Sequence, residues 1–151
     1  MKKWLFGTGV FVLAMVVGAV LFHHFYPSGG AASGIEVDWR LLGEMDYVSA
    51  KSSSPELEAL NGKQIKIPGF MVPLEDSQKL VTEFLLVPSP QACIHVPPPP
   101  PNQMVFVKMK KGAEVAFGPI WVYGVLNLVT KKSIYGEASF ELVGESIEPY
   151  R

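Results

Sequence analysis

The chain has few of the residues that build disulfides, metal clusters and nucleophilic active sites. It contains one cysteine, Cys93, among 151 residues, so no disulfide can form within it. Neither a CxxC nor an HxxxH spacing occurs, although a closed structural zinc site needs four ligands. The GxSxG turn that presents a nucleophilic serine is absent as well. We therefore predict that the protein is not an enzyme.

A basic surface is also lacking. The formal net charge is −1 at pH 7, and the N-terminal Lys2 and Lys3 contribute two of the positive charges. Lys108, Lys110 and Lys111 form the one basic cluster elsewhere, and we interpret them as the solvated end of a strand. Proteins that bind nucleic acid neutralise phosphates with many lysines and arginines. We therefore predict no nucleic acid partner.

One long apolar run, residues 4–22, carries no charge. As a helix it would span roughly 28 Å, which nearly matches the hydrocarbon core of a bilayer. Lys2 and Lys3 precede it and place residues 1–3 in the cytoplasm by the positive-inside rule. We predict a transmembrane anchor at 4–22, a linker at 23–36 and an exported domain at 37–151. A cleaved signal peptide is the alternative, because small residues at 29–33 would supply a cleavage site.

The exported part has the pattern of an all-β domain. Ser54 and Pro55 are residue types typical of the start of a helix, and Gly62 is typical of its end, so one short helix is expected between them. After Gly62, apolar strand patterns follow at 64–74, 83–87, 104–109, 121–129 and 139–147. Interior glycines at 69, 124 and 144 suit the bends and bulges of a small closed barrel. We predict a five-stranded OB-like barrel behind the anchor and the short helix, with an open β-sandwich as the alternative.

Cys93 and His95 are candidate metal ligands. In extended backbone, residues two apart face the same side, so the thiolate and the imidazole could bind one zinc or copper ion, with Glu75 as a third ligand. Simple burial of Cys93 is the alternative, since an unpaired thiol in an oxidising compartment needs protection. A catalytic thiol paired with His95 is less favoured, because parallel side chains do not point toward each other.

A run of five prolines follows this pair. Proline fixes φ and lacks an N–H group, so the run is expected to extend as polyproline II for roughly 15 Å. Such a rod either covers the barrel or docks into an aromatic-lined groove on a partner. The predicted partner-binding residues are Pro97, Pro98, Pro99, Pro100, Pro101, Asn102 and Gln103.

Three motifs together resemble a family of uncharacterised bacterial exported proteins that share a domain of unknown function. They are GFMVPLE at 69–75, FLLVP at 84–88 and ACIHVPPPPPNQ at 92–103, and the resemblance covers roughly residues 37–148. It implies small periplasmic or lipid-anchored proteins found beside ABC permeases and periplasmic zinc-binding proteins. The acylated cysteine of the lipoprotein members is missing here.

We therefore predict a single-pass bacterial inner-membrane protein with its C-terminal domain in the periplasm. Its expected role is that of an accessory to an ABC-type envelope transporter and to zinc homeostasis, with the permease or a periplasmic metal-binding protein as partner. The alternative is a metal-free protein-interaction module that uses the edge formed by Cys93, His95 and the prolines.

Overall fold

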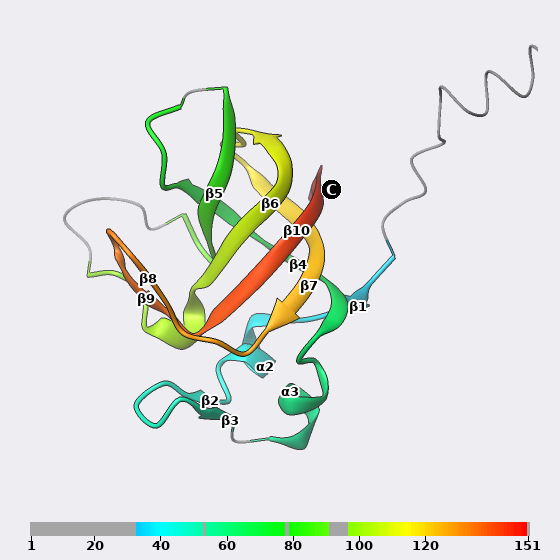
Figure 1. The fold of residues 1–151 in the computed structure, drawn as a ribbon, viewed down its shortest axis with the longest axis vertical. Coiled ribbons are helices and arrows are strands. Elements are labelled where there is room, and N and C mark those ends of the chain that lie inside the picture. Colours follow the sequence, from blue (N-terminus) through cyan, green and yellow to red (C-terminus); the bar gives the residue numbers. More distant parts are fainter. Residues whose placement is uncertain (1–32, 53, 78, 91–96, 151) are drawn as a thin grey trace, which may run out of the picture. The chain divides into compact units, whose positions relative to one another are not determined.

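The computed structural model describes residues 33–52, 54–77, 79–90 and 97–150, which belong to one compact unit, Ala32–Arg151. Strands dominate it, together with two short α-helices and a single 3-10 turn (Figure 1). In chain order the elements are β1 (Ile35–Glu36), α2 (Trp39–Leu42), β2 (Met45–Asp46), β3 (Lys51–Ser52), α3 (Pro55–Ala59), β4 (Lys63–Pro73), β5 (Leu80–Val87), η1 (Pro101–Gln103), β6 (Val105–Glu114), β7 (Pro119–Asn127), β8 (Lys131–Ser133), β9 (Gly136–Ala138) and β10 (Phe140–Pro149).

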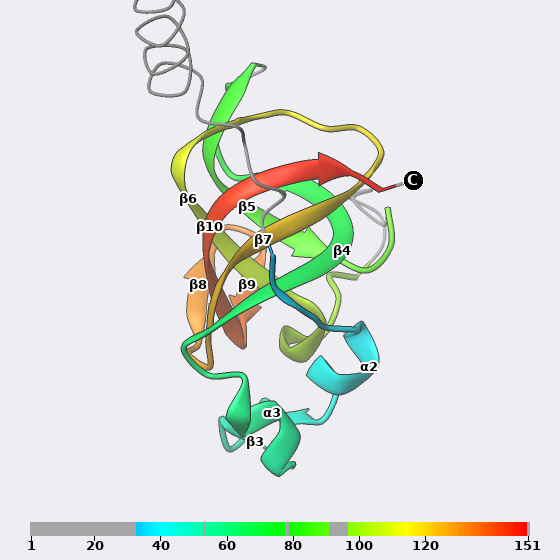
Figure 2. The ribbon, with the colours of Figure 1, turned by 90° about the vertical axis from the view of Figure 1, so that its right-hand side faces the viewer.

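The long strands close into a barrel. β4, β5, β6, β10 and β7 are hydrogen-bonded in that order, and β4 also pairs with β7 to complete the ring (Figure 2). All these pairs are antiparallel except β6 with β10, which run parallel. The predicted five-stranded closed barrel is therefore confirmed, and each of its strands overlaps one of the predicted strand segments.

Alternation along the strands builds the core. In β4 every second residue from Ile65 to Met71 is buried, because successive side chains of a strand point to opposite faces. Phe84 and Phe140 are fully buried from two other strands and belong to the same main cluster. A side chain of this size contributes about 2 to 3 kcal/mol when it is fully buried, so the barrel interior is the main source of stability.

The short helix expected after residue 54 is present as α3. The Ser54 hydroxyl accepts a hydrogen bond from the Leu57 N–H at 3.2 Å, and Pro55 occupies the first turn. Leu57 is fully buried in the main cluster, which fixes α3 to the barrel. The helix α2 was not predicted; its four residues depend on Asp38, whose side chain caps the Leu41 N–H at 2.8 Å.

Two glycines lie opposite each other where β7 meets β10. Gly124 and Gly144 are register partners, and the register shifts immediately after Gly144. A Cβ atom on Gly124 would meet the Val143 carbonyl oxygen and lie 2.9 Å from the Gly144 Cα. The register shift agrees, for Gly144, with the expectation that the interior glycines allow bends and bulges, and the two backbones approach too closely for a side chain at Gly124.

The predicted anchor at 4–22 lies outside the described residues. Among the helices that are described, none is long and apolar enough to cross a membrane.

Candidate functional site

The proline run, which we call the proline edge (residues 97–101), leads into η1 and β6. Pro97, Pro98 and Pro100 are exposed, and Pro99 and Pro101 are half-buried. Pro100 has φ −63° and ψ 154°, which are polyproline II values. The predicted extended conformation is therefore confirmed at Pro100, and the edge offers apolar rings without N–H donors to solvent.

The C-terminal end of the proline edge is fixed to the barrel. The Pro101 carbonyl oxygen accepts hydrogen bonds from the Met104 N–H at 3.2 Å and the Ser139 N–H at 2.9 Å. Met104 is buried in a second apolar cluster together with Leu85 and Ala138. The exposed prolines are thus attached to the barrel at their C-terminal end, through Pro101.

Asn102 and Gln103 bind other parts of the same chain. The Asn102 amide donates to the carbonyl oxygens of Gly43 and Met45, both at 3.1 Å. The Gln103 amide donates to the Trp39 carbonyl oxygen at 3.2 Å and to that of Asn102 at 3.3 Å. These residues were predicted to bind a partner, and the structure shows that their amide groups hold α2 against η1.

Trp39 continues this connection into the barrel. Its indole Nε1–H donates to the Pro68 carbonyl oxygen of β4 at 2.6 Å, and its side chain packs against the main cluster. The path from Pro68 through Trp39 to Gln103 and the proline edge is therefore made of hydrogen-bonded groups. Asn102 and Gln103 act as positioning residues for the edge.

Of the three predicted metal ligands, the structure describes only Glu75. Cys93 and His95 lie outside the described residues, so the metal site that they suggest stays a prediction. Within the part of the chain that is described, no three His, Cys, Asp or Glu side chains gather closely enough to hold an ion. Met71, Met104 and Met109 are buried, as expected for methionines that fill the core.

Glu75 has a local structural role beside β5. One of its carboxylate oxygens accepts hydrogen bonds from the Thr82 hydroxyl at 2.6 Å, the Thr82 N–H at 2.8 Å and the Glu83 N–H at 2.8 Å. These residues lie where the register between β5 and β6 shifts, between Val81 and Glu83. The Thr82 hydroxyl and then the two N–H groups lower the pKa of Glu75 below its ordinary value of 4.5.

The lowered pKa gives a pH-dependent prediction for Glu75→Gln. A carboxyl group with a lower pKa in the folded chain stabilises the fold above its unfolded pKa, and this stabilisation is lost as pH falls through the folded value. We expect the variant to be less stable than the parent at pH 7 and the difference to shrink below about pH 4.5. Urea unfolding across this pH range measures it. Glu58→Gln, at an exposed position of α3, is the control, and an equal loss at all pH values would contradict the role of the charge.

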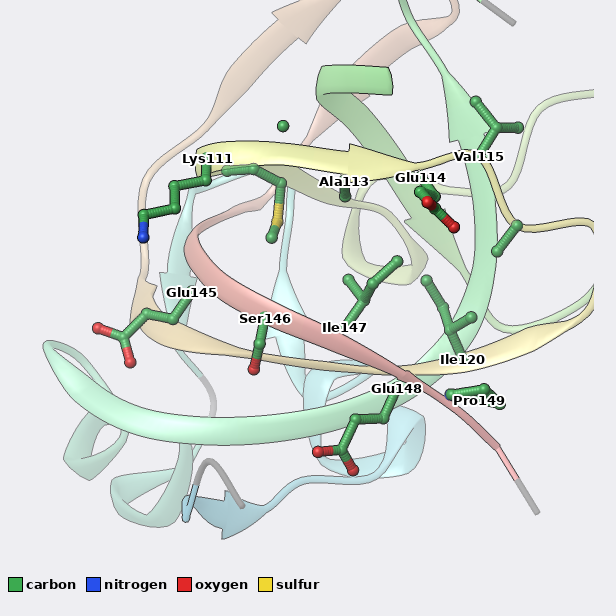
Figure 3. Close-up of a pocket in the computed structure, with 13 residues that line it drawn as sticks. Lys111, Ala113, Glu114, Val115, Ile120, Glu145, Ser146, Ile147, Glu148 and Pro149 are labelled. Atoms are coloured by element: carbon green, nitrogen blue, oxygen red, sulfur yellow. The ribbon is translucent and has the colours of Figure 1, made fainter. Parts of the chain in front are cut away.

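A second feature was not predicted at all. β6 and β10 diverge beyond Met109 and Gly144 and leave a cavity of about 520 Å³ (Figure 3). The pairing pattern that creates it cannot be read from the alternation of single strands. The cavity and the proline edge lie at opposite ends of β6, since η1 directly precedes Val105 and the cavity is lined by the residues around Glu114.

Comparisons with known proteins identify the family. Residues 40–149 match a family described as "Protein of unknown function (DUF3299)". A crystal structure of a DUF3299 family protein from Pseudomonas aeruginosa PAO1 is similar, with 35% sequence identity and a TM-score of 0.62, and covers 79% of this chain and 97% of that chain. Among curated proteins, none matches the chain. The expected resemblance to a domain of unknown function is thus confirmed, and the chain belongs to the DUF3299 family.

Proposed function

We propose that this protein is a non-enzymatic accessory protein that docks a partner through the proline edge. One observation carries the proposal: three of the five prolines are exposed, while the run is fixed at Pro101 and by the amides of Asn102 and Gln103. Extended prolines lose little conformational entropy on binding and fit grooves lined by aromatic rings. The partner therefore presents such a groove.

The location of the protein is part of the proposal. The uncharged run at 4–22 and the lysines before it support a single-pass inner-membrane anchor with the barrel in the periplasm. The strand order, in which the third and fifth barrel strands are parallel, supports an OB-like barrel. OB-like barrels serve as binding scaffolds, which agrees with an accessory role beside an envelope transporter of the ABC type.

A metal-dependent version is the second candidate. The Cys93 and His95 spacing, directly before the proline edge in sequence, favours a zinc ion shared with the partner. Two ligands from this chain would leave two positions for the partner or for water. Zinc would then join the two proteins, and the prolines would provide the adjoining contact surface.

Photo-crosslinking in the native host tests both versions. We place p-benzoylphenylalanine at Pro98 of the full chain and, as the control, at Val48, which is 85% exposed on the β2–β3 connection. A discrete adduct from position 98 and none from position 48 is expected. It should disappear when Pro97, Pro99 and Pro100 are replaced by serine, because serine does not hold polyproline II rigidly.

Cys93→Ser separates the metal-free version from the metal version. If the adduct at position 98 persists in this variant and in the presence of a zinc chelator, docking needs no ion. If it disappears under both conditions, zinc joins the partners. The absence of any adduct specific to position 98 would contradict docking through the proline edge.

A further inference from the structure

The barrel opens between β6 and β10, at a place that we call the fork: residues 110–114 of β6 and 145–149 of β10. The parallel pairing between the two strands runs from Val105 and Phe140 to Met109 and Gly144. Beyond that point Ala113 and Glu114 of β6 pair with Val81 and Leu80 of β5, and residues 146–149 of β10 pair with β7. Ala113 and Glu114 of β6 and residues 146–149 of β10 therefore have a paired strand on their outer edge and none among the described residues on the edge that faces the fork.

A hydrogen bond at the end of β10 fixes which of its backbone groups face the fork. The Tyr150 N–H donates to the Pro119 carbonyl oxygen at 3.0 Å, so the backbone groups of Tyr150 face β7. In an antiparallel pair, the backbone N–H and C=O groups of every second residue face the partner strand. The backbone groups of Glu148 therefore also face β7, and those of Ile147 face the fork. Pro149 faces it too and has no N–H to leave unpaired, which suits an open edge.

The same reasoning applies to β6. The Val115 N–H donates to the Lys79 carbonyl oxygen at 3.1 Å, which directs Val115 toward the β5 side. The phase of the ladder then turns the backbone groups of Ala113 toward β5 and the N–H and C=O groups of Glu114 toward the fork. Two strand edges with free backbone groups thus face the same space.

The space between these edges has an apolar interior. Its walls include Met109, Ala113, Val115, Ile120 and Ile147. Figure 3 shows Ile147 and Ile120 directed from β10 and β7 toward β6. A volume of about 520 Å³ is within the range of cavities that take small ligands or a few apolar side chains.

The lining carries excess negative charge, and an exposed aromatic residue follows it in the chain. Phe117, next to the lining residue Ala116, is 95% exposed. The lining includes Lys111 and three glutamates; Glu145 pairs with Lys110 at 2.6 Å, and Glu148 accepts a hydrogen bond from the Tyr123 hydroxyl at 3.1 Å. The exposed carboxylate of the third, Glu114, makes no ion pair with another described residue.

We propose that the fork binds an extended peptide segment of a partner protein, which adds a strand along the open edge of β10. Ile147 would exchange backbone hydrogen bonds with the segment, apolar side chains would enter the cavity, and a basic side chain would pair with Glu114. The apolar interior requires the apolar residues, and the unpaired carboxylate selects the positive charge. This site lies at the other end of β6 from the proline edge and does not depend on docking there.

The test uses the full chain in lipid nanodiscs and fluorescein-labelled heptapeptides. The peptides have lysine at both ends and valine or threonine at every interior position, so that they are extended, apolar and basic. We expect saturable binding in fluorescence anisotropy by the members that alternate valine with threonine. Failure of the whole pool to bind would overturn the proposal.

Two surface variants locate the binding. Glu114→Lys is expected to weaken the best peptide about fivefold, since an exposed ion pair is lost and a like charge is introduced. Phe117→Ser should weaken it about tenfold through the loss of apolar contact. Neither change alters the core, because both side chains are exposed. The matched controls, Glu58→Lys on α3 and Ile134→Ser between β8 and β9, should bind like the parent, and equal losses in the controls would contradict the site.

Backbone methylation tests the strand pairing itself. A strand added to an edge directs alternate amides toward its neighbour. Methylation of one alternate set of peptide amides should abolish binding, and methylation of the other set should leave most of it. If both sets bind equally well or both fail, the segment does not pair with β10 as a strand.

Discussion

Gly124→Ala is expected to destabilise the barrel by about 2 to 3 kcal/mol, as overpacking against rigid surroundings does. The new Cβ would press against the Val143 carbonyl oxygen and lie 2.9 Å from the Gly144 Cα. Both obstacles are backbone atoms of the paired strand, so no side chain can rotate away to relieve the contact. Relief requires β7 and β10 to separate, which weakens their ladder.

Urea unfolding followed by tryptophan fluorescence measures this loss. The midpoint should fall while the slope stays constant, because the surface exposed on unfolding is unchanged. Gly118→Ala is the matched control, since nothing lies within 4 Å of a Cβ built there, and it should change stability by less than about 0.5 kcal/mol. Equal stability of the two variants would contradict the close approach of the strands.

The barrel could be predicted because its signal is local and repeated. Each strand has an apolar face of period two, as in β4, and the glycine at 144 marks the bulge that helps the sheet curve. The helix α2 and the β8–β9 hairpin escaped prediction because each has only a few residues, too short for a period. The α2 helix depends on a single capping residue, Asp38, and β8 and β9 pair over only three residues each.

Lys108, Lys110 and Lys111 are exposed as expected, but they lie within β6 (Val105–Glu114) and not at the end of a strand. Lys108 pairs with Glu83 at 3.0 Å and Lys110 with Glu145 at 2.6 Å, and both lysines remain exposed at strand positions. Exposed ion pairs of this kind contribute little to stability. They agree with a solvated sheet face.

The candidate sites divide in the same way. The proline edge is visible in the sequence because composition alone dictates its conformation. Its attachment is not, since the carbonyl groups that Asn102 and Gln103 bind lie 57 to 64 residues away along the chain. The fork could not be predicted from the sequence, because it arises where two strands stop pairing. Each of these strands has an ordinary strand pattern by itself.

Asn102→Asp is expected to lower the free energy of unfolding by about 1 to 2 kcal/mol, since two hydrogen bonds are lost and the groups are partly solvated. The parent amide donates to the carbonyl oxygens of Gly43 and Met45. A carboxylate of the same shape has no hydrogen to donate and would repel both oxygens. The effect should be local, so α2 should open more often than the barrel.

Hydrogen exchange separates this positioning role from the predicted partner contact. The Gly43 N–H, which donates to the Trp39 carbonyl oxygen at 3.0 Å, should exchange about tenfold faster in Asn102→Asp, while Val122 in the barrel should not change. Asn61→Asp is the matched control, because that side chain accepts from the Leu128 N–H at 3.0 Å and aspartate still accepts there. If exchange stays normal in Asn102→Asp but the adduct from position 98 is lost, Asn102 contacts the partner directly and the positioning role is wrong.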